Sequence, residues 1–144
     1  MAHPISLMLH RAFSGFELSP HLFLSEFLQI AIFLPVTGRR TAEILKERPN
    51  WQLFLDGCPG GESPNQIGAR ADRAVKRVRA IDGDVLVFSS GHFLRVFAAR
   101  WLGLDAAFGR YFLLSTASLS ALGYEHNLSE PVIRLWDDTR HVVS

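Results

Sequence analysis

The most constraining feature of this 144-residue sequence is a short apolar run between two amphipathic stretches. Residues 84–89, DVLVFS, predict a strand that is buried on both faces. Residues 64–81 and 92–102, on either side of it, place apolar side chains at helical spacing. The order of helix, buried strand, tight turn and helix predicts an α/β layered domain.

Local signals mark where the first of these helices begins and ends. Ser63, Pro64 and Gln66 form a capping box with proline at the first helical position. Asp82-Gly83 ends the helix. Its predicted core face consists of Ile67, Ala71, Ala74, Val75, Val78 and Ile81.

Weaker patterns complete the secondary structure. Thr41 caps a short helix, TAEILKER, which Pro49 ends. Residues 117–124 and 131–136 alternate like strands, and the tail 137–144 is polar and predicted to be irregular.

The first 37 residues differ in composition from the rest. They hold only three charged side chains and five of the 11 phenylalanines. Their apolar run, residues 22–34, is too short to span a bilayer, which takes about 20 apolar residues. We therefore expect an atypical apolar N-terminal segment, 1–37, a domain over 38–144, and no stable membrane insertion.

Charge and cysteine content limit the partners and the compartment. Fifteen basic and 14 acidic residues leave a net charge of +1, which argues against a nucleic-acid partner. The single cysteine, Cys58, excludes an internal disulfide framework and favours the cytoplasm.

The chemistry is expected at the strand–turn–helix of residues 89–95. Ligands of α/β sheets bind beyond the carboxyl ends of strands, and a helix N-terminus there suits an anion such as phosphate. Gly91 permits close approach of the backbone, and His92 supplies an imidazole that can act as nucleophile or as acid and base. Arg95, one turn further on, is either an anion ligand or a buried ion-pair partner.

Four stretches resemble the C-terminal part of the histidine phosphatase superfamily, the phosphoglycerate-mutase-like fold. They are GRRTAEILKERPNWQLFLDGCPGGESP, DVLVFSSGHFLRVFAARWLGL, YFLLSTASLSALGYEH and PVIRLW, all within residues 38–141. The resemblance implies a three-layer α/β sandwich, incomplete at its N-terminus. It also implies phosphoryl transfer without metal or cofactor: a histidine attacks phosphorus, and water or a second acceptor resolves the phosphohistidine. The substrate would be a small phosphorylated metabolite.

The family's site residues carry over only in part. No Arg-His-Gly, the family's nucleophile motif, occurs in the sequence. In the second motif Ser90 stands where the family has its second catalytic histidine, so we expect Ser90 and His92 to be the catalytic residues, with Gly91 in the substrate site. The Gly-Glu-Ser motif at 61–63 adds Glu62 and Arg70 as substrate-binding residues. The alternatives are a solvated helix arginine for Arg70 and, for Glu62, a helix N-terminal carboxylate in a structural contact.

Three functions follow from these observations. The first is a phosphatase or mutase of the histidine phosphatase type. The second is a truncated or frameshifted member of the family that is catalytically dead and at most binds phosphate, in which uncovered apolar helix faces would favour a homo-oligomer. The third is a serine hydrolase using Ser89 or Ser90, although the Gly-x-Ser-x-Gly elbow is absent.

Overall fold

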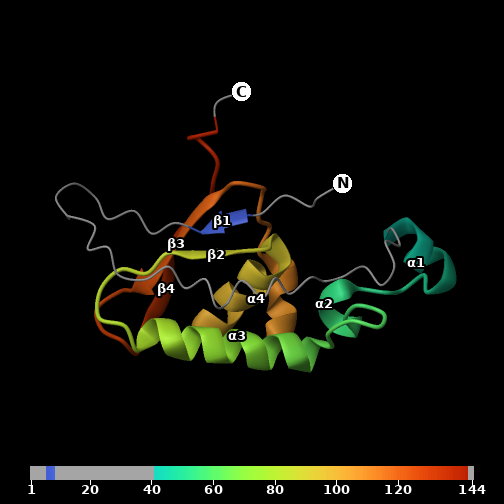
Figure 1. Cartoon of the computed structure of the whole chain (residues 1–144), viewed down its shortest axis with the longest axis horizontal. Coiled ribbons are helices and arrows are strands. Elements are labelled where there is room, and N and C mark those ends of the chain that lie inside the picture. The colour runs from blue at the N-terminus through green and yellow to red at the C-terminus, as the bar shows by residue number, and fades with distance from the viewer. Residues whose placement is uncertain (1–5, 9–40, 143–144) are drawn as a thin grey trace.

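The computed structural model describes residues 6–8 and 41–142, to which all structural statements below refer (Figure 1). The chain combines helices and strands, in agreement with the predicted α/β class. The elements are β1 (Ser6–Met8), α1 (Thr41–Glu47), α2 (Leu53–Asp56), α3 (Pro64–Arg79), β2 (Val87–Ser89), α4 (Gly91–Trp101), the 3₁₀ helix η3 (Ala106–Tyr111), β3 (Leu119–Tyr124) and β4 (Pro131–Asp138). Apart from β1, the predicted segment 1–37 lies outside the described residues.

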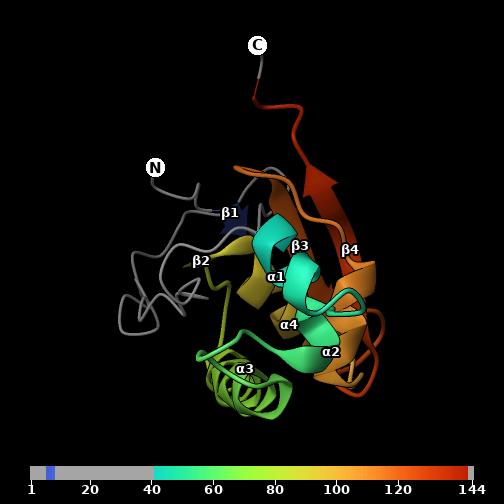
Figure 2. The same ribbon diagram turned by 90° about the vertical axis from the view of Figure 1, so that its right-hand side faces the viewer.

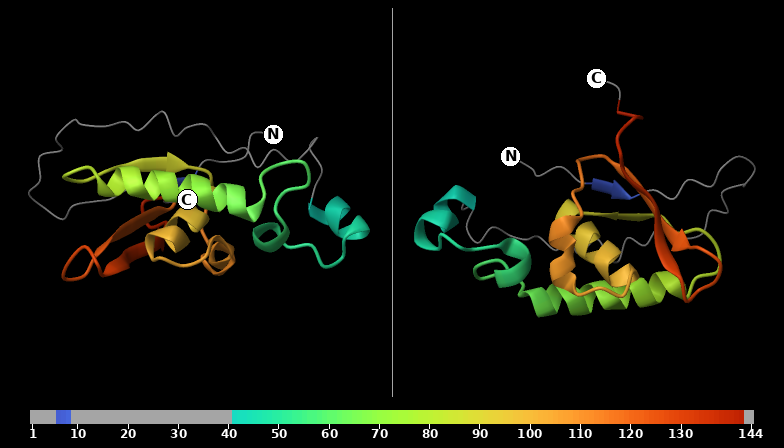
Figure 3. Two further views of the ribbon diagram at one scale, coloured as in Figure 1. Left: turned by 90° about the horizontal axis from the view of Figure 1, so that it is seen from below. Right: turned by 180° about the vertical axis from the view of Figure 1, so that it is seen from behind.

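The described strands form two antiparallel pairs rather than one parallel sheet. β1 pairs with β2, with Ser6 opposite Ser89, and β3 pairs with β4, with Leu122 opposite Ile133. Helix α4 lies between α3 and the strands (Figure 1), and α3 runs along its outer side (Figure 3). The start of α4 is therefore anchored from both sides.

The predicted strand at 84–89 is shorter and less buried than expected. Only residues 87–89 are in β2, and of these only Ser89 is buried, while Val87 and Phe88 are half-buried. Residues 81–83, with Gly83 at a φ of 113°, form a bend after α3, and the exposed Asp84 follows it outside the strand.

Helix α3 follows its sequence signals closely. The Ser63 hydroxyl accepts from the Gln66 backbone N–H at 3.3 Å, and the Gln66 side chain accepts from the Ser63 N–H at 2.8 Å. This is the predicted capping box, with Pro64 at the first position. The small buried side chains Ala71 and Ala74 allow α4 to pack closely on this face.

The core consists mainly of α4 packed on α3. Phe93, Leu94, Val96 and Phe97 of α4 are at most 2 % exposed. At the end of the helix, the Trp101 indole N–H donates to the Gly123 carbonyl at 3.1 Å and so joins α4 to β3. These contacts hold α4 rigidly, and with it the residues at its start.

Two elements that the sequence did not predict lie near the start of α4. Helix α2 lies next to the N-terminal end of α3, on the side of the molecule where α1 also lies (Figure 2), and η3 follows α4.

Strand β4 runs two residues past the predicted end at Trp136. The tail was therefore predicted to become irregular too early: the Asp137 carboxylate accepts from the N–H and hydroxyl of Ser115.

None of the helices in the described ranges is both long and apolar enough to cross a membrane.

Candidate functional site at the start of helix α4

Helix α4 begins one residue after β2, and its first turn carries three of the predicted site residues. Ser90 is the N-cap in extended conformation, and its side chain makes no capping hydrogen bond. The first intrahelical bond runs from the Leu94 N–H to the Ser90 carbonyl at 3.0 Å. A helix start directs N–H groups outward and carries the positive end of the helix dipole, so an anion is stabilised there.

The Ser90 hydroxyl is an unsatisfied polar group. Within residues 6–8 and 41–142 it is the only buried side-chain oxygen or nitrogen without a hydrogen-bond partner. Such a group costs about 1–3 kcal/mol. The residue as a whole is only half-buried, so rotation about χ1 can bring the hydroxyl to the helix start. Ser90 can therefore donate to a group bound there.

His92 is exposed, in the first turn of α4. Its ring lies 5.9 Å from the Phe54 ring of α2, measured between centroids, with the planes tilted by 42°. By contrast, His126 pairs with Glu130 at 2.7 Å, in the turn between β3 and β4. Of these two histidines, His92 is the one at an anion-binding helix start.

Glu62 and Arg70 form a bidentate ion pair. Arg70 Nε lies 2.9 Å from Glu62 Oε1, and Arg70 Nη2 lies 2.8 Å from Glu62 Oε2. The Arg70 side chain is 16 % exposed and the Glu62 side chain 29 %. The Arg70 guanidinium also lies 4.3 Å from the centroid of the Phe93 ring, which brings it to the first turn of α4. The two predicted substrate-binding residues thus bind each other in this structure, through two of the guanidinium nitrogens.

Arg95 is not the ion-pair partner that was one of the two roles predicted for it. Its Nε donates to the Gly109 carbonyl at 2.9 Å and its Nη2 to the Arg110 carbonyl at 3.0 Å. The Phe54 ring covers the guanidinium at 4.4 Å, and burial lowers the pKa of Arg95. The partner of Arg95 is the backbone of η3, which a motif search cannot identify because carbonyls are common to all residues.

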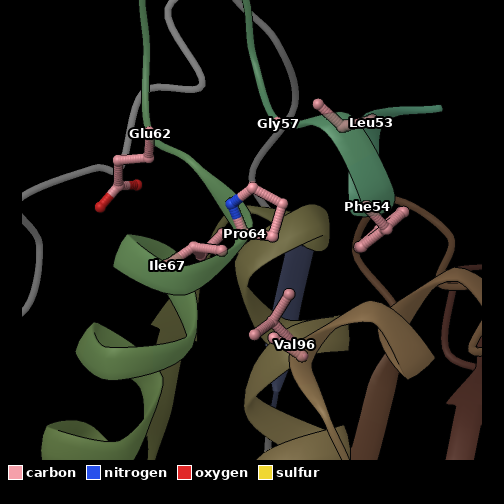
Figure 4. A pocket seen from close by; sticks show the side chains of 8 residues that line it. Leu53, Phe54, Gly57, Glu62, Pro64, Ile67 and Val96 are labelled. Carbon is pink, nitrogen blue, oxygen red and sulfur yellow. The ribbon is translucent and has the colours of Figure 1, made fainter. Parts of the chain in front are cut away.

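The pocket between α2, α3 and α4 is too small for a substrate. Its volume is about 10 Å³, close to that of a single water, and Phe54, Pro64, Ile67 and Val96 give it an apolar lining (Figure 4). Glu62 lies at its edge, with the carboxylate pointing away from these residues. This pocket therefore has no room for a phosphorylated ligand.

A larger hollow of about 430 Å³ lies at the other end of α4, where it is lined by Val78, Trp101 and Tyr124 among others. None of the five predicted site residues lines it. Among the residues of known placement, no three His, Cys, Asp or Glu side chains gather into a group that could hold a metal ion.

Comparisons with known proteins give this geometry a context. The chain is 39 % identical over 95 residues to an acid phosphatase of Mycobacterium tuberculosis, covering 65 % of this chain and 47 % of that protein. It is 41 % identical over 75 residues to the sedoheptulose 1,7-bisphosphatase of Saccharomyces cerevisiae, covering 46 % of this chain and 27 % of the relative. The chain thus spans less than half the length of these curated relatives.

A solved structure from Mycobacterium tuberculosis, the product of an open reading frame, superimposes with a TM-score of 0.65 at 37 % identity. The match covers 69 % of this chain and 51 % of that one, and it confirms the predicted fold class. The sequence model of the histidine phosphatase superfamily, branch 1, matches residues 31–139, which include most of the predicted domain. This chain belongs to the histidine phosphatase superfamily.

Proposed function

We propose that the chain carries out phosphoryl transfer on a small phosphorylated metabolite at the start of α4. One observation carries the proposal: the uncapped helix start brings together the unsatisfied Ser90 hydroxyl, the exposed His92 and, through Phe93, the Arg70 guanidinium. Family membership supports the reaction class, and both curated relatives are named as phosphatases.

Each residue has a role in this proposal. An imidazole nitrogen of His92 forms a bond to phosphorus while the ester P–O bond breaks, and the leaving oxygen takes a proton from solvent. Water then attacks the phosphohistidine, and the P–N bond breaks to release inorganic phosphate. The Gly91 N–H, the Ser90 hydroxyl and Arg70 stabilise charge on the phosphoryl oxygens, where such reactions gain most of their stabilisation.

A second candidate is phosphate binding without transfer. It is favoured by Ser90, which stands where the family has its second catalytic histidine, and by the absence of an Arg-His-Gly sequence from these 144 residues. The helix dipole, the backbone N–H groups and a serine hydroxyl bind phosphate without any nucleophile. This candidate keeps the site residues and removes only the chemical step.

Turnover of p-nitrophenyl phosphate in the presence of a chelator tests the two candidates. Transfer requires activity in the wild type that His92→Ala abolishes and the control variant His126→Ala retains. Activity that His92→Ala leaves unchanged would overturn our assignment of the nucleophile. No turnover, together with phosphate binding that Ser90→Ala weakens, would establish the second candidate. The substrate panel should include sedoheptulose 1,7-bisphosphate, the compound that appears in the name of the yeast relative.

For the assembly and the location, we propose a cytoplasmic homo-oligomer. Tyr111, Leu113 and Leu128 are 64 %, 73 % and 76 % exposed, and they are the side chains that we expect a second copy to cover. The single cysteine, Cys58, fits a reducing compartment. Light scattering after size exclusion tests the first proposal, and a monomeric mass would overturn it; cell fractionation tests the second.

A further inference from the structure

We propose that Phe54 of α2 is a positioning residue for His92. Sequence reasoning did not identify Phe54, which follows a stretch without strong helix signals. In the structure its ring lies against two residues on one side of α4, His92 at 5.9 Å between centroids and the Arg95 guanidinium at 4.4 Å. The inference rests on the proposed function, since it concerns how the imidazole is held for a phosphorylated ligand.

The Phe54 ring is itself held in place by η3. Gly109 of η3 packs so closely on it that a Cβ there would lie 3.0 Å from Phe54 Cε1. Arg95 fixes η3 against α4 through its bonds to the Gly109 and Arg110 carbonyls. The ring is therefore confined between α4 and η3 and provides a fixed surface for the imidazole.

An exposed histidine in a first helical turn has several rotamers open to it. Contact with an aromatic ring favours one of them, because tilted aromatic pairs attract through their edges and faces. His92 is nevertheless an exposed residue. Phe54 thus restricts the direction of the side chain without covering it.

NMR of the full chain tests the contact directly. The His92 ring signals, assigned by their absence from His92→Ala, should show a ring-current shift that Phe54→Leu removes and Phe54→Tyr retains. The matched control is Phe112→Leu, which removes another half-buried ring, one that lies 5.5 Å from Trp136. Phe112→Leu should leave the His92 signals unchanged. If Phe54→Leu acted only by loosening the fold in general, Phe112→Leu would shift these signals too.

Titration with inorganic phosphate tests the consequence. We expect Phe54→Leu to weaken binding several-fold, His92→Ala to weaken it at least as much, and Phe54→Tyr to restore it. His92 signals that do not move in Phe54→Leu would overturn the inference, as would phosphate binding that depends on His92 and not on Phe54. If the signals move and neither variant changes phosphate binding, the contact stands and the proposed function fails.

Discussion

Replacing Glu62 by glutamine distinguishes a structural role of this residue from a ligand-binding one. The carboxylate accepts from both Arg70 Nε, at 2.9 Å, and Arg70 Nη2, at 2.8 Å. A glutamine keeps one acceptor oxygen and turns an NH₂ group toward one of the two donors. The substitution therefore removes the negative charge and one hydrogen bond, and leaves the size of the side chain almost unchanged.

The magnitude follows from the exposure of the pair. Hydrogen bonds to charged groups contribute about 1.5–3 kcal/mol and fully exposed ion pairs about 0–1 kcal/mol. With side chains 16 % and 29 % exposed, the pair lies between these cases, and we expect Glu62→Gln to lower the free energy of unfolding by about 1–2 kcal/mol. Phosphate bound beside Arg70 would lose a repulsive neighbour. Two unit charges roughly 6 Å apart in water repel each other by about 0.7 kcal/mol. Removing the Glu62 charge should therefore lower the Kd for phosphate about threefold.

Urea unfolding followed by tryptophan fluorescence and titration with inorganic phosphate measure the two effects. The matched control is Asp72→Asn, which breaks a second bidentate pair between α3 and α4, to Arg100 at 2.6 and 3.0 Å. Asp72 is 49 % exposed, so the control should lose less stability and keep its phosphate affinity. A weaker affinity in Glu62→Gln would refute our reasoning, because it would mean that Glu62 supports phosphate binding, directly or by holding Arg70, more than its charge opposes it.

Three further substitutions test the packing and the charges. Leu94→Ala, at a side chain with no exposure, should cost about 3 kcal/mol in urea unfolding, and a loss below about 1 kcal/mol would contradict a close-packed α4. Gly109→Ala should cost about 1–2 kcal/mol because its methyl group would press on Phe54, and unchanged stability would refute that contact. The side-chain hydrogen bond from Arg140 holds the pKa of Asp138 well below its usual range, so the pair's contribution is present at neutral pH and is lost only as the pH falls through that lowered pKa. In Arg140→Ala, the titration midpoint of the Asp138 carboxylate, measured by NMR, should rise toward 3.8, and an unchanged midpoint would contradict the pairing.

Local sequence determined the parts of the fold that were predicted well. The capping box of α3 involves residues three positions apart, and the core face of that helix follows from helical spacing alone. The length of β2 depends instead on pairing with Ser6–Met8, more than 75 residues away. The pattern DVLVFS describes apolar character but contains no information on how much of the run finds a partner strand, so the predicted strand was too long.

The candidate site likewise depends on both local sequence and distant contacts. Ser90, Gly91 and His92 share one helix start because they are adjacent in sequence, and Arg70 joins them through the packing of α3 on α4. No local spacing rule predicts the ion pair of Arg70 with Glu62, which lie eight residues apart. The role of Phe54 could not be predicted either, because it depends on how α2 and η3 meet beside α4.

The groups at the start of α4 are held by different means, and this separates binding from transfer. Ser90 is placed by the backbone between β2 and α4, Arg70 by its ion pair with Glu62, and His92 by contact with Phe54. Backbone N–H groups, the hydroxyl and the imidazole all contribute to binding phosphate, while transfer also requires the imidazole to lie in line with the breaking bond. Variants of Phe54 should therefore affect transfer, if it occurs, more strongly than variants that only weaken the helix start. The effect of Phe54 variants on transfer, divided by the effect of the variants that weaken the helix start, reports whether this chain uses His92 as a nucleophile.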